Sequence, residues 1–199
     1  MKDTKNIKKF LKTVFARRVT VINAIIVLIF IFLAIFAPFA APYDPDKPDF
    51  AAFLQLPSAA HLLGTDNFGR DVLSRIIYGT RVSLIIGVLA VFVACVIGTV
   101  FGMIAGYFGG WIDDLITRLM EAVRAIPQII LAMALTAVFG SGIRNLAIIL
   151  GISSMAGYVR MMRGQVLTIK QADYIMAGKL QGNKDFRLMF RHILPNSIS

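Results

Sequence analysis

An uncharged stretch at residues 82–112 decides the fold of this chain: VSLIIGVLAVFVACVIGTVFGMIAGYFGGWI. A helix needs about 20 apolar residues to cross the hydrocarbon core of a bilayer. This stretch is longer and predicts a membrane-spanning helix that ends at a glycine-rich turn, residues 106–110. The composition agrees, because 57% of the residues are hydrophobic and only 16% are charged, whereas soluble domains are about 45–50% apolar.

Three other apolar segments have membrane length: residues 19–41, 115–139 and about 145–162. The last is short, because the uncharged residues between Arg144 and Arg160 span only about 22 Å as a helix. The two arginines can reach opposite interfaces and make up the difference. The sequence therefore predicts an all-α membrane protein with about four transmembrane helices.

The basic N-terminus followed by an apolar run also has the pattern of a secretory signal peptide. The uncharged run continues to Tyr43, however, which is too long for the apolar core of a signal peptide. No convincing cleavage site of small residues closes the run. We therefore expect a retained first helix.

The distribution of positive charge predicts the orientation in the membrane. Seven Lys and Arg precede Val19 and seven more lie from Arg160 onward, whereas residues 42–81 carry four, together with five aspartates. Cytoplasmic loops are enriched in Lys and Arg, so both ends are expected in the cytoplasm and residues 42–81 outside. The net charge of +10 is therefore explained by topology, and nucleic-acid binding is not expected.

The predicted organisation follows from these segments. It comprises a cytoplasmic basic N-terminus, a first transmembrane helix, an extracytoplasmic loop, transmembrane helices 2–4 and a cytoplasmic loop, at residues 1–18, 19–41, 42–81, 82–163 and 164–199. Within the outer loop, apolar residues at helical spacing after Asp71 predict a short amphipathic helix over residues 70–78 that lies at the interface.

Two sets of residues inside the predicted helices are candidates for special roles. Gly98, Gly102 and Gly106 are four residues apart, which puts them on one helix face and favours close approach of a neighbouring helix. Ionisable groups in a membrane helix are costly and tend to face protein or water. Arg118, Glu121 and Arg124 lie three residues apart, so they predict either a gate network or a neutralised helix end at headgroup level. Pro127 is expected to kink this helix.

Catalytic and metal-binding residues are not expected. His61 and His192 are predicted on opposite sides of the membrane, and neither has a cluster of carboxylates or cysteines nearby in the sequence. The single Cys95 has no disulfide partner. No glycine-rich phosphate loop with Lys-Ser/Thr occurs, so we expect neither ATP binding by this chain, nor any cofactor, nor enzymatic activity.

The basic tail is predicted to form two helices joined by a corner at Gly182 and Asn183. Residues 172–181 form the first helix. In the second, Phe186, Met189, Phe190 and Ile193 recur at helical spacing, with Arg187 and Arg191 on the wet side. Leu194-Pro195 should end it. Small residues at Ala177, Gly178 and Gly182 would leave a shallow surface for a partner to contact. The alternative is a basic loop that binds lipid headgroups.

Three stretches resemble the inner-membrane permease subunits of ABC importers, in the dipeptide, oligopeptide and nickel branch. They are HLLGTDNFGRDVLSRIIYGTRVSL at residues 61–84, GYFGGWIDD at residues 106–114, and the tail from RGQVL at residues 163–167 to HILPN at residues 192–196. The tail is similar to the family's cytoplasmic "EAA" loop, which docks on ATP-hydrolysing subunits.

The resemblance implies roles for residues of the tail. Asp173 and Tyr174 stand at the acidic and aromatic start of the loop, Ala177 and Gly178 where the family usually has two alanines, and Leu194-Pro195 closes it. Gly182 matches the family's glycine. Gly178 in place of alanine should loosen the helix by roughly 1 kcal/mol. Together with the spacing above, the expected docking residues are Asp173, Tyr174, Ala177, Gly178, Gly182, Phe186, Arg187, His192, Leu194 and Pro195.

The resemblance also implies partners and a reaction. These are a second permease subunit, two ATP-binding subunits, an extracytoplasmic substrate-binding protein and the lipid bilayer of the inner membrane. The family has six helices, whereas this sequence stops at Ser199 before the last two, so a truncated product or a fragment is expected. The substrate would be a peptide or a related small solute such as a nickel chelate. The alternative is a truncated, non-transporting membrane adaptor that binds a cytoplasmic partner.

Overall fold

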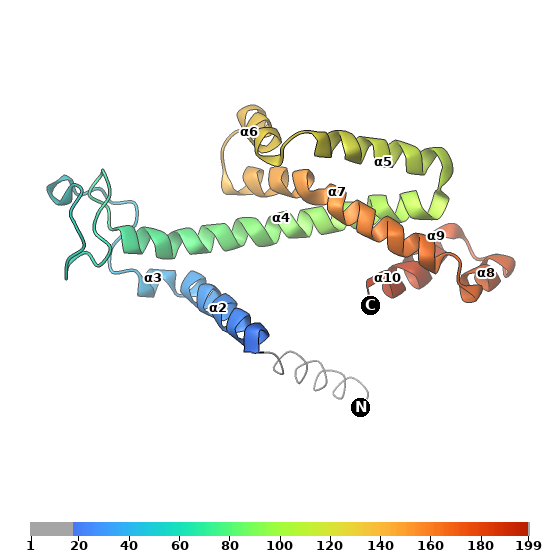
Figure 1. Ribbon diagram of the computed structural model, residues 1–199, viewed down its shortest axis with the longest axis horizontal. Helices are drawn as coiled ribbons and strands as arrows, with labels where there is room; N and C mark the ends of the chain where they lie inside the picture. Colours follow the sequence, from blue (N-terminus) through green and yellow to red (C-terminus); the bar gives the residue numbers. More distant parts are fainter. Residues whose placement is uncertain (1–17, 199) are drawn as a thin grey trace. The chain divides into compact units, whose positions relative to one another are not determined.

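The computed structural model describes residues 18–198, and every regular element in that range is helical apart from one isolated bridge between Thr65 and Asp71. The chain divides into two compact units, residues 1–85 and 86–199, and each is described by itself. Three described helices, α2, α4 and α7, are long and apolar enough to cross a membrane, and the bent pair of α5 and α6 would make a fourth. The expected all-α membrane fold is therefore confirmed (Figure 1).

The first unit begins with the apolar helix α2 (Arg18–Ile35), followed by the short α3 (Ala37–Ala40). Most side chains around α2 are exposed, as expected for a helix that is apolar on every face and needs lipid or protein around it. The expected single span over residues 19–41 is interrupted at Phe36, where Pro38 begins a new helical turn. Proline fits the first turn of a helix because that position needs no N–H donor.

An extracytoplasmic loop was expected after α3, and residues 41–71 contain only one short 3₁₀ helix, η1 (Phe50–Ala52). The separate interfacial helix expected over residues 70–78 is wrong, because these residues form the start of the long helix α4 (Val72–Phe108). Asp71 caps this helix, since its carboxylate accepts the N–H of Ser74 at 2.8 Å. Arg81 interrupts the apolar sequence but not the backbone hydrogen bonds, so the helix continues.

In the second unit, the end of α4 leads into α5 (Gly110–Ala125) and α6 (Gln128–Phe139). A turn was expected over residues 106–110, but α4 continues to Phe108 and the turn contains only Gly109 and Gly110. Gly109 and Gly110 make the turn with φ values of 66° and 53°, which only glycine adopts without strain. The predicted kink at Pro127 is present, and the axes of α5 and α6 are bent by 92°.

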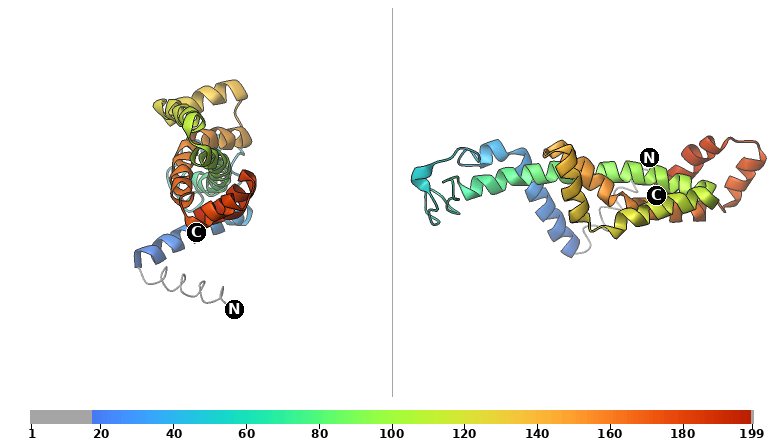
Figure 2. Two further views of the ribbon diagram at one scale, coloured as in Figure 1. Left: turned by 90° about the vertical axis from the view of Figure 1, so that its right-hand side faces the viewer. Right: turned by 90° about the horizontal axis from the view of Figure 1, so that it is seen from above.

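The longest helix after the bend is α7 (Ile143–Ile169), which exceeds the expected span of residues 145–162 at both ends. Four short helical elements follow it: α8 (Asp173–Leu180), α9 (Asp185–Leu188), the π-helix η2 (Met189–Ile193) and α10 (Leu194–Ile198). We call residues 170–198 the elbow, because Gly182 lies at a sharp corner between α8 and α9. The right-hand view of Figure 2 shows this corner at one end of the second unit.

Candidate docking site

The three spaced glycines of α4 lie against α7. A Cβ atom added at Gly102 would come within 2.5 Å of the Val159 carbonyl oxygen, and one added at Gly106 within 2.8 Å of the Val166 Cβ. Gly98 faces the Cβ of Tyr158 in the same way. The absence of side chains therefore lets the two backbones approach closely, and Figure 1 shows α7 beside this part of α4.

Asp113 on α5 and Arg163 on α7 form a bidentate ion pair that was not foreseen from the sequence. Nε and Nη2 of Arg163 each donate at 2.5 Å, to the two carboxylate oxygens of Asp113. Thr117 also donates to this carboxylate, at 3.2 Å, and Asp113 is only 8% exposed. Because a guanidinium and a carboxylate match as two parallel hydrogen bonds, the pair fixes the start of α5 against α7.

The role of Arg118, Glu121 and Arg124, as a gate network or as a neutralised helix end, stays a prediction. All three are exposed on α5, and no ion pair joins them within residues 18–198. Glu121 instead borders a cavity of about 240 Å³ between α5 and α7. An exposed i,i+3 pair gains little energy in isolation, whereas Arg163 finds a more buried partner in Asp113.

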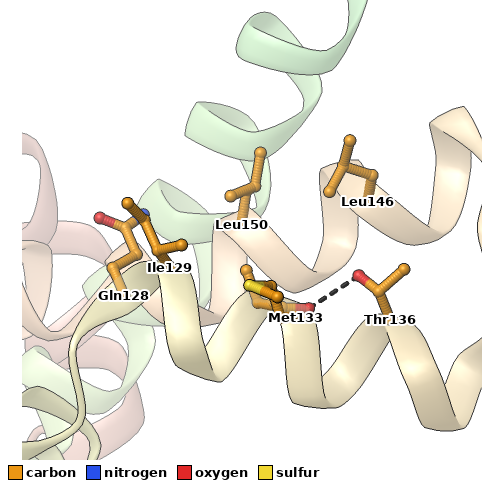
Figure 3. Close-up of a pocket in the computed structure, with 7 residues that line it drawn as sticks. Gln128, Ile129, Met133, Thr136, Leu146 and Leu150 are labelled. Atoms are coloured by element: carbon orange, nitrogen blue, oxygen red, sulfur yellow. Dashed lines mark hydrogen bonds between the residues drawn. The ribbon is translucent and has the colours of Figure 1, made fainter.

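A second, apolar hollow lies between α6 and α7, with a volume of about 560 Å³. Figure 3 shows residues that line this hollow, among them Leu146 and Leu150 of α7 and Ile129 and Met133 of α6. The hydroxyl of Thr136 at one end of this hollow donates to the carbonyl of Ala132 at 2.7 Å. The α6 helix buries none of its residues in the described part of the chain, so its apolar surface remains available for lipid or for other helices.

The elbow contains most of the residues expected to dock. Gly182 has φ +78°, which explains why glycine stands at the corner. The prediction that Leu194-Pro195 ends the second helix is wrong. The N–H of Leu194 donates to the carbonyl of Met189, five residues earlier, and Pro195 then lies in the first turn of α10. The chain therefore continues from η2 into α10 without a break in the helix.

The inner face of the elbow is packed against α4 and α7. Ile175, Leu188 and Ile193 of the elbow are 0–1% exposed. They form one apolar cluster with Met103 and Tyr107 of α4, Met162 and Val166 of α7, and Met189 of the elbow. Gly178 lets α8 approach α9, since a Cβ atom there would lie 2.9 Å from a methyl group of Leu188. Burial of several large apolar side chains holds the elbow in a defined position.

The outer face of the elbow remains exposed although it is rich in apolar side chains. Leu180 is 90% exposed, Phe186 71% and Tyr174 49%. The rings of Phe186 and Phe190 stack with centroids 4.4 Å apart. Of the expected docking residues, Asp173, Tyr174, Ala177, Gly182, Phe186, Arg187 and Pro195 are exposed, whereas Gly178, His192 and Leu194 are partly buried. Apolar side chains gathered on an otherwise charged surface are typical of a protein contact.

The described residues contain no group of three or more His, Cys, Asp or Glu side chains that could hold a metal ion. Cys95 is exposed on α4 and unpaired. In the second unit, α7 packs against α4 and α5, and the elbow packs against α4 and α7.

Two family models match most of the chain. Residues 98–199 match the family described as binding-protein-dependent transport system inner membrane component. Residues 7–57 match the N-terminal TM domain of oligopeptide transport permease C. The first match covers the glycine face of α4, the ion pair, α6 and the elbow.

The most similar proteins found include transport permeases. The chain is 42% identical to the dipeptide transport system permease protein DppC of Alkalihalophilus pseudofirmus, over 92% of the chain and 60% of the relative. It is 39% identical to the glutathione transport system permease protein GsiD of Pectobacterium atrosepticum, over 96% and 64%. The chain thus spans about three fifths of the length of these relatives. By its family matches and its spanning helices, it belongs to the inner membrane component family of binding-protein-dependent transport systems.

Proposed function

We propose that this chain is a permease subunit of an ATP-driven importer of peptides, and that the elbow is its docking surface for an ATP-binding subunit. The names of the two relatives favour a dipeptide or a glutathione-like peptide over a nickel chelate. In this proposal the chain contributes part of the wall of the pathway. A second permease subunit, two ATP-binding subunits and a substrate-binding protein complete the importer.

The two faces of the elbow carry the proposal. One face is buried against α4 and α7 through Ile175, Leu188 and Ile193, and the other exposes Leu180 and Phe186. A surface that is both firmly attached to membrane helices and open to a partner is suited to transmit movement. Closure of an ATP-binding dimer would displace the elbow and, through it, the spanning helices between inward-open and outward-open arrangements.

The proposed orientation follows from the charge distribution. With the basic N-terminus and the basic elbow both in the cytoplasm, the loop at residues 42–71 faces the other side, where a substrate-binding protein delivers peptide. The outer loop is held by ion pairs of Asp66 with Arg70 and Arg75 at 2.8 and 2.7 Å. These pairs would give a delivering protein a fixed surface to contact.

Substitution of Gly182 tests the docking surface. Leucine at this position has open space around it but must adopt φ +78°, a strain of about 1–3 kcal/mol for a residue with a side chain. We expect Gly182→Leu to abolish co-purification with the ATP-binding subunit while insertion into the membrane is unchanged. Gly164→Leu is the matched control, because Gly164 also has open space around it but lies within α7 and has no positive φ.

Peptide uptake in cells that lack the corresponding permease tests the transport activity. Restored uptake supports the proposal. Co-purification with the ATP-binding subunit without any uptake would instead indicate a membrane adaptor. Unchanged co-purification of the Gly182→Leu variant would exclude the elbow as the docking surface.

A further inference from the structure

Tyr107, in the last turn of α4, connects this helix to the elbow by a buried side chain with a polar end. Only 3% of its surface is exposed, and its ring belongs to the apolar cluster that contains Ile175 of α8 and Leu188 of α9. Its hydroxyl donates a hydrogen bond to the carboxylate of Asp185, the first residue of α9. Hydrogen bonds to an ionised acceptor are stronger than those between neutral groups.

Two lysines of the elbow, one before α8 and one in its last turn, contact the same tyrosine. Lys170 precedes α8, and its Nζ donates at 2.5 Å to the carbonyl of Tyr107. A cation is favoured there, because the last carbonyls of a helix lack backbone donors and carry partial negative charge. Lys179 lies in the last turn of α8, with its Nζ 5.2 Å from the centroid of the Tyr107 ring, within the range of a cation–π interaction.

We propose that Tyr107 is the positioning residue that makes the elbow and the end of α4 move as one body during the transport cycle. This inference rests on the proposed function of the chain. Tyr107 is attached before α8, at its end and at the start of α9, so α8 cannot be displaced without either moving α4 or breaking these contacts. Without these polar contacts, only the apolar cluster would transmit a movement of the elbow to the membrane helices.

The first experiment measures the attachment itself by hydrogen exchange of the protein in membranes. Tyr107→Phe keeps the ring and removes only the hydroxyl. Loss of a hydrogen bond to a charged group corresponds to about a tenfold change in an equilibrium, so we expect amide exchange in α8 and α9 to rise about tenfold. Exchange in α5 should not change. Tyr158→Phe is the control, because the Tyr158 hydroxyl of α7 makes no hydrogen bond within the described residues.

The second experiment measures coupling as the amount of peptide imported per ATP hydrolysed by the assembled importer. We expect Tyr107→Phe to lower this ratio several-fold while the ATP-binding subunit remains bound and hydrolyses ATP. Asp185→Ala should have the same effect, and Asp185→Asn, which keeps an acceptor oxygen, should retain more of the ratio. The double variant Tyr107→Phe/Asp185→Ala should be no worse than either single variant, because both remove one interaction.

The outcomes separate this inference from the proposed function. If the unsubstituted importer hydrolyses ATP but imports no peptide, the proposed function is wrong. Independently of that result, amide exchange in α8 and α9 that is unchanged in Tyr107→Phe would show that Tyr107 does not attach the elbow to α4, and would overturn the inference. If import occurs and Tyr107→Phe raises exchange without lowering the ratio, the tyrosine only stabilises the fold and the positioning role is wrong. An equal loss of coupling in Tyr158→Phe would overturn the inference as well.

Discussion

Arg163 of α7 holds both carboxylate oxygens of Asp113, which lies 50 residues earlier at the start of α5, at 2.5 Å each. The pair lies at the level of the glycine contact, because a Cβ atom added at Gly102 would come within 3.1 Å of the Arg163 nitrogen and one added at Gly106 within 3.0 Å of the Arg163 carbonyl oxygen. It therefore fixes α5 at the level where movement of the elbow would enter the membrane helices.

Removal of the Asp113 charge should destabilise the second unit. Asp113→Asn replaces the bidentate ion pair by at most one hydrogen bond from Arg163 to an uncharged amide oxygen, and we expect a loss of about 2 kcal/mol in the free energy of unfolding. Arg163→Lys should cost nearly as much, because an ammonium group cannot make the two parallel hydrogen bonds. Thermal unfolding in detergent measures the stability of both variants.

Asp114→Asn is the control. The neighbouring Asp114 is exposed, and its substitution should change stability by no more than about 0.5 kcal/mol. Equal effects of the two Asp→Asn variants would contradict the role of the pair.

Alanine at Gly102 should force α4 and α7 apart. The added Cβ would lie 2.5 Å from the Val159 carbonyl oxygen and 2.8 Å from the Met162 Cβ, and overpacking of this kind costs about 1–3 kcal/mol. Gly87→Ala is the matched control in the same helix, because no atom lies within 4 Å of its added Cβ. That variant should be neutral or slightly stabilising, since alanine favours a helix by up to about 1 kcal/mol over glycine. A melting temperature that falls equally in both variants would exclude the close packing.

The outer loop should resist mild acid. Desolvation raises the pKa of the Asp66 carboxyl, but hydrogen bonds from the Arg70 side chain and from the N–H groups of Phe68 and Arg70 outweigh it, so the pKa lies well below its usual range. A depressed pKa in the folded state contributes stability above the unfolded value of about 3.9, and this stability is lost as the pH falls through the folded value. Folding of the loop should therefore be unaffected between pH 7 and pH 5.

Hydrogen-exchange protection factors of residues 43–71 at pH 7, 5 and 3 test this expectation. They should be equal at the first two pH values and begin to fall at the third. Asp66→Asn should show low protection already at pH 7, because the ion pairs with Arg70 and Arg75 are lost. If the wild-type protection factors fell between pH 7 and pH 5, the ion pairs would not be what holds the loop.

The apolar runs and their lengths were sufficient to predict α2, α4 and α7, because crossing a bilayer requires a length and a composition that are read directly from the sequence. The start of α4 was predicted after Arg81 but lies at Val72. Hydropathy marks where a helix enters the lipid, whereas the backbone hydrogen bonds of the helix begin earlier. The corner at Gly182 was predicted from local chemistry. The continuation of the helix through Pro195 was not predicted, because it depends on the π-helical turn η2 before it.

Contacts between residues far apart in the chain could not be predicted from the sequence. Asp113 and Arg163 are each ordinary charged residues in their own segments, and only the packing of α5 on α7 brings them together. The signal that was present is an acid in the first turn after Gly109-Gly110. In the same way Tyr107 lay within a stretch that carried the family resemblance, but its three partners in the elbow are named only by the fold.

Cysteine cross-linking between the elbow and an ATP-binding subunit tests the central claim most directly. Phe186→Cys would be introduced into a Cys95→Ala background, because Cys95 is itself exposed, with Asp46→Cys in the outer loop as the control. The account predicts that Phe186→Cys cross-links to the ATP-binding subunit in membranes, that its yield changes when ATP is added, and that Asp46→Cys gives no cross-link. No cross-link from Phe186→Cys in an assembled complex, or an equal one from Asp46→Cys, would contradict the account.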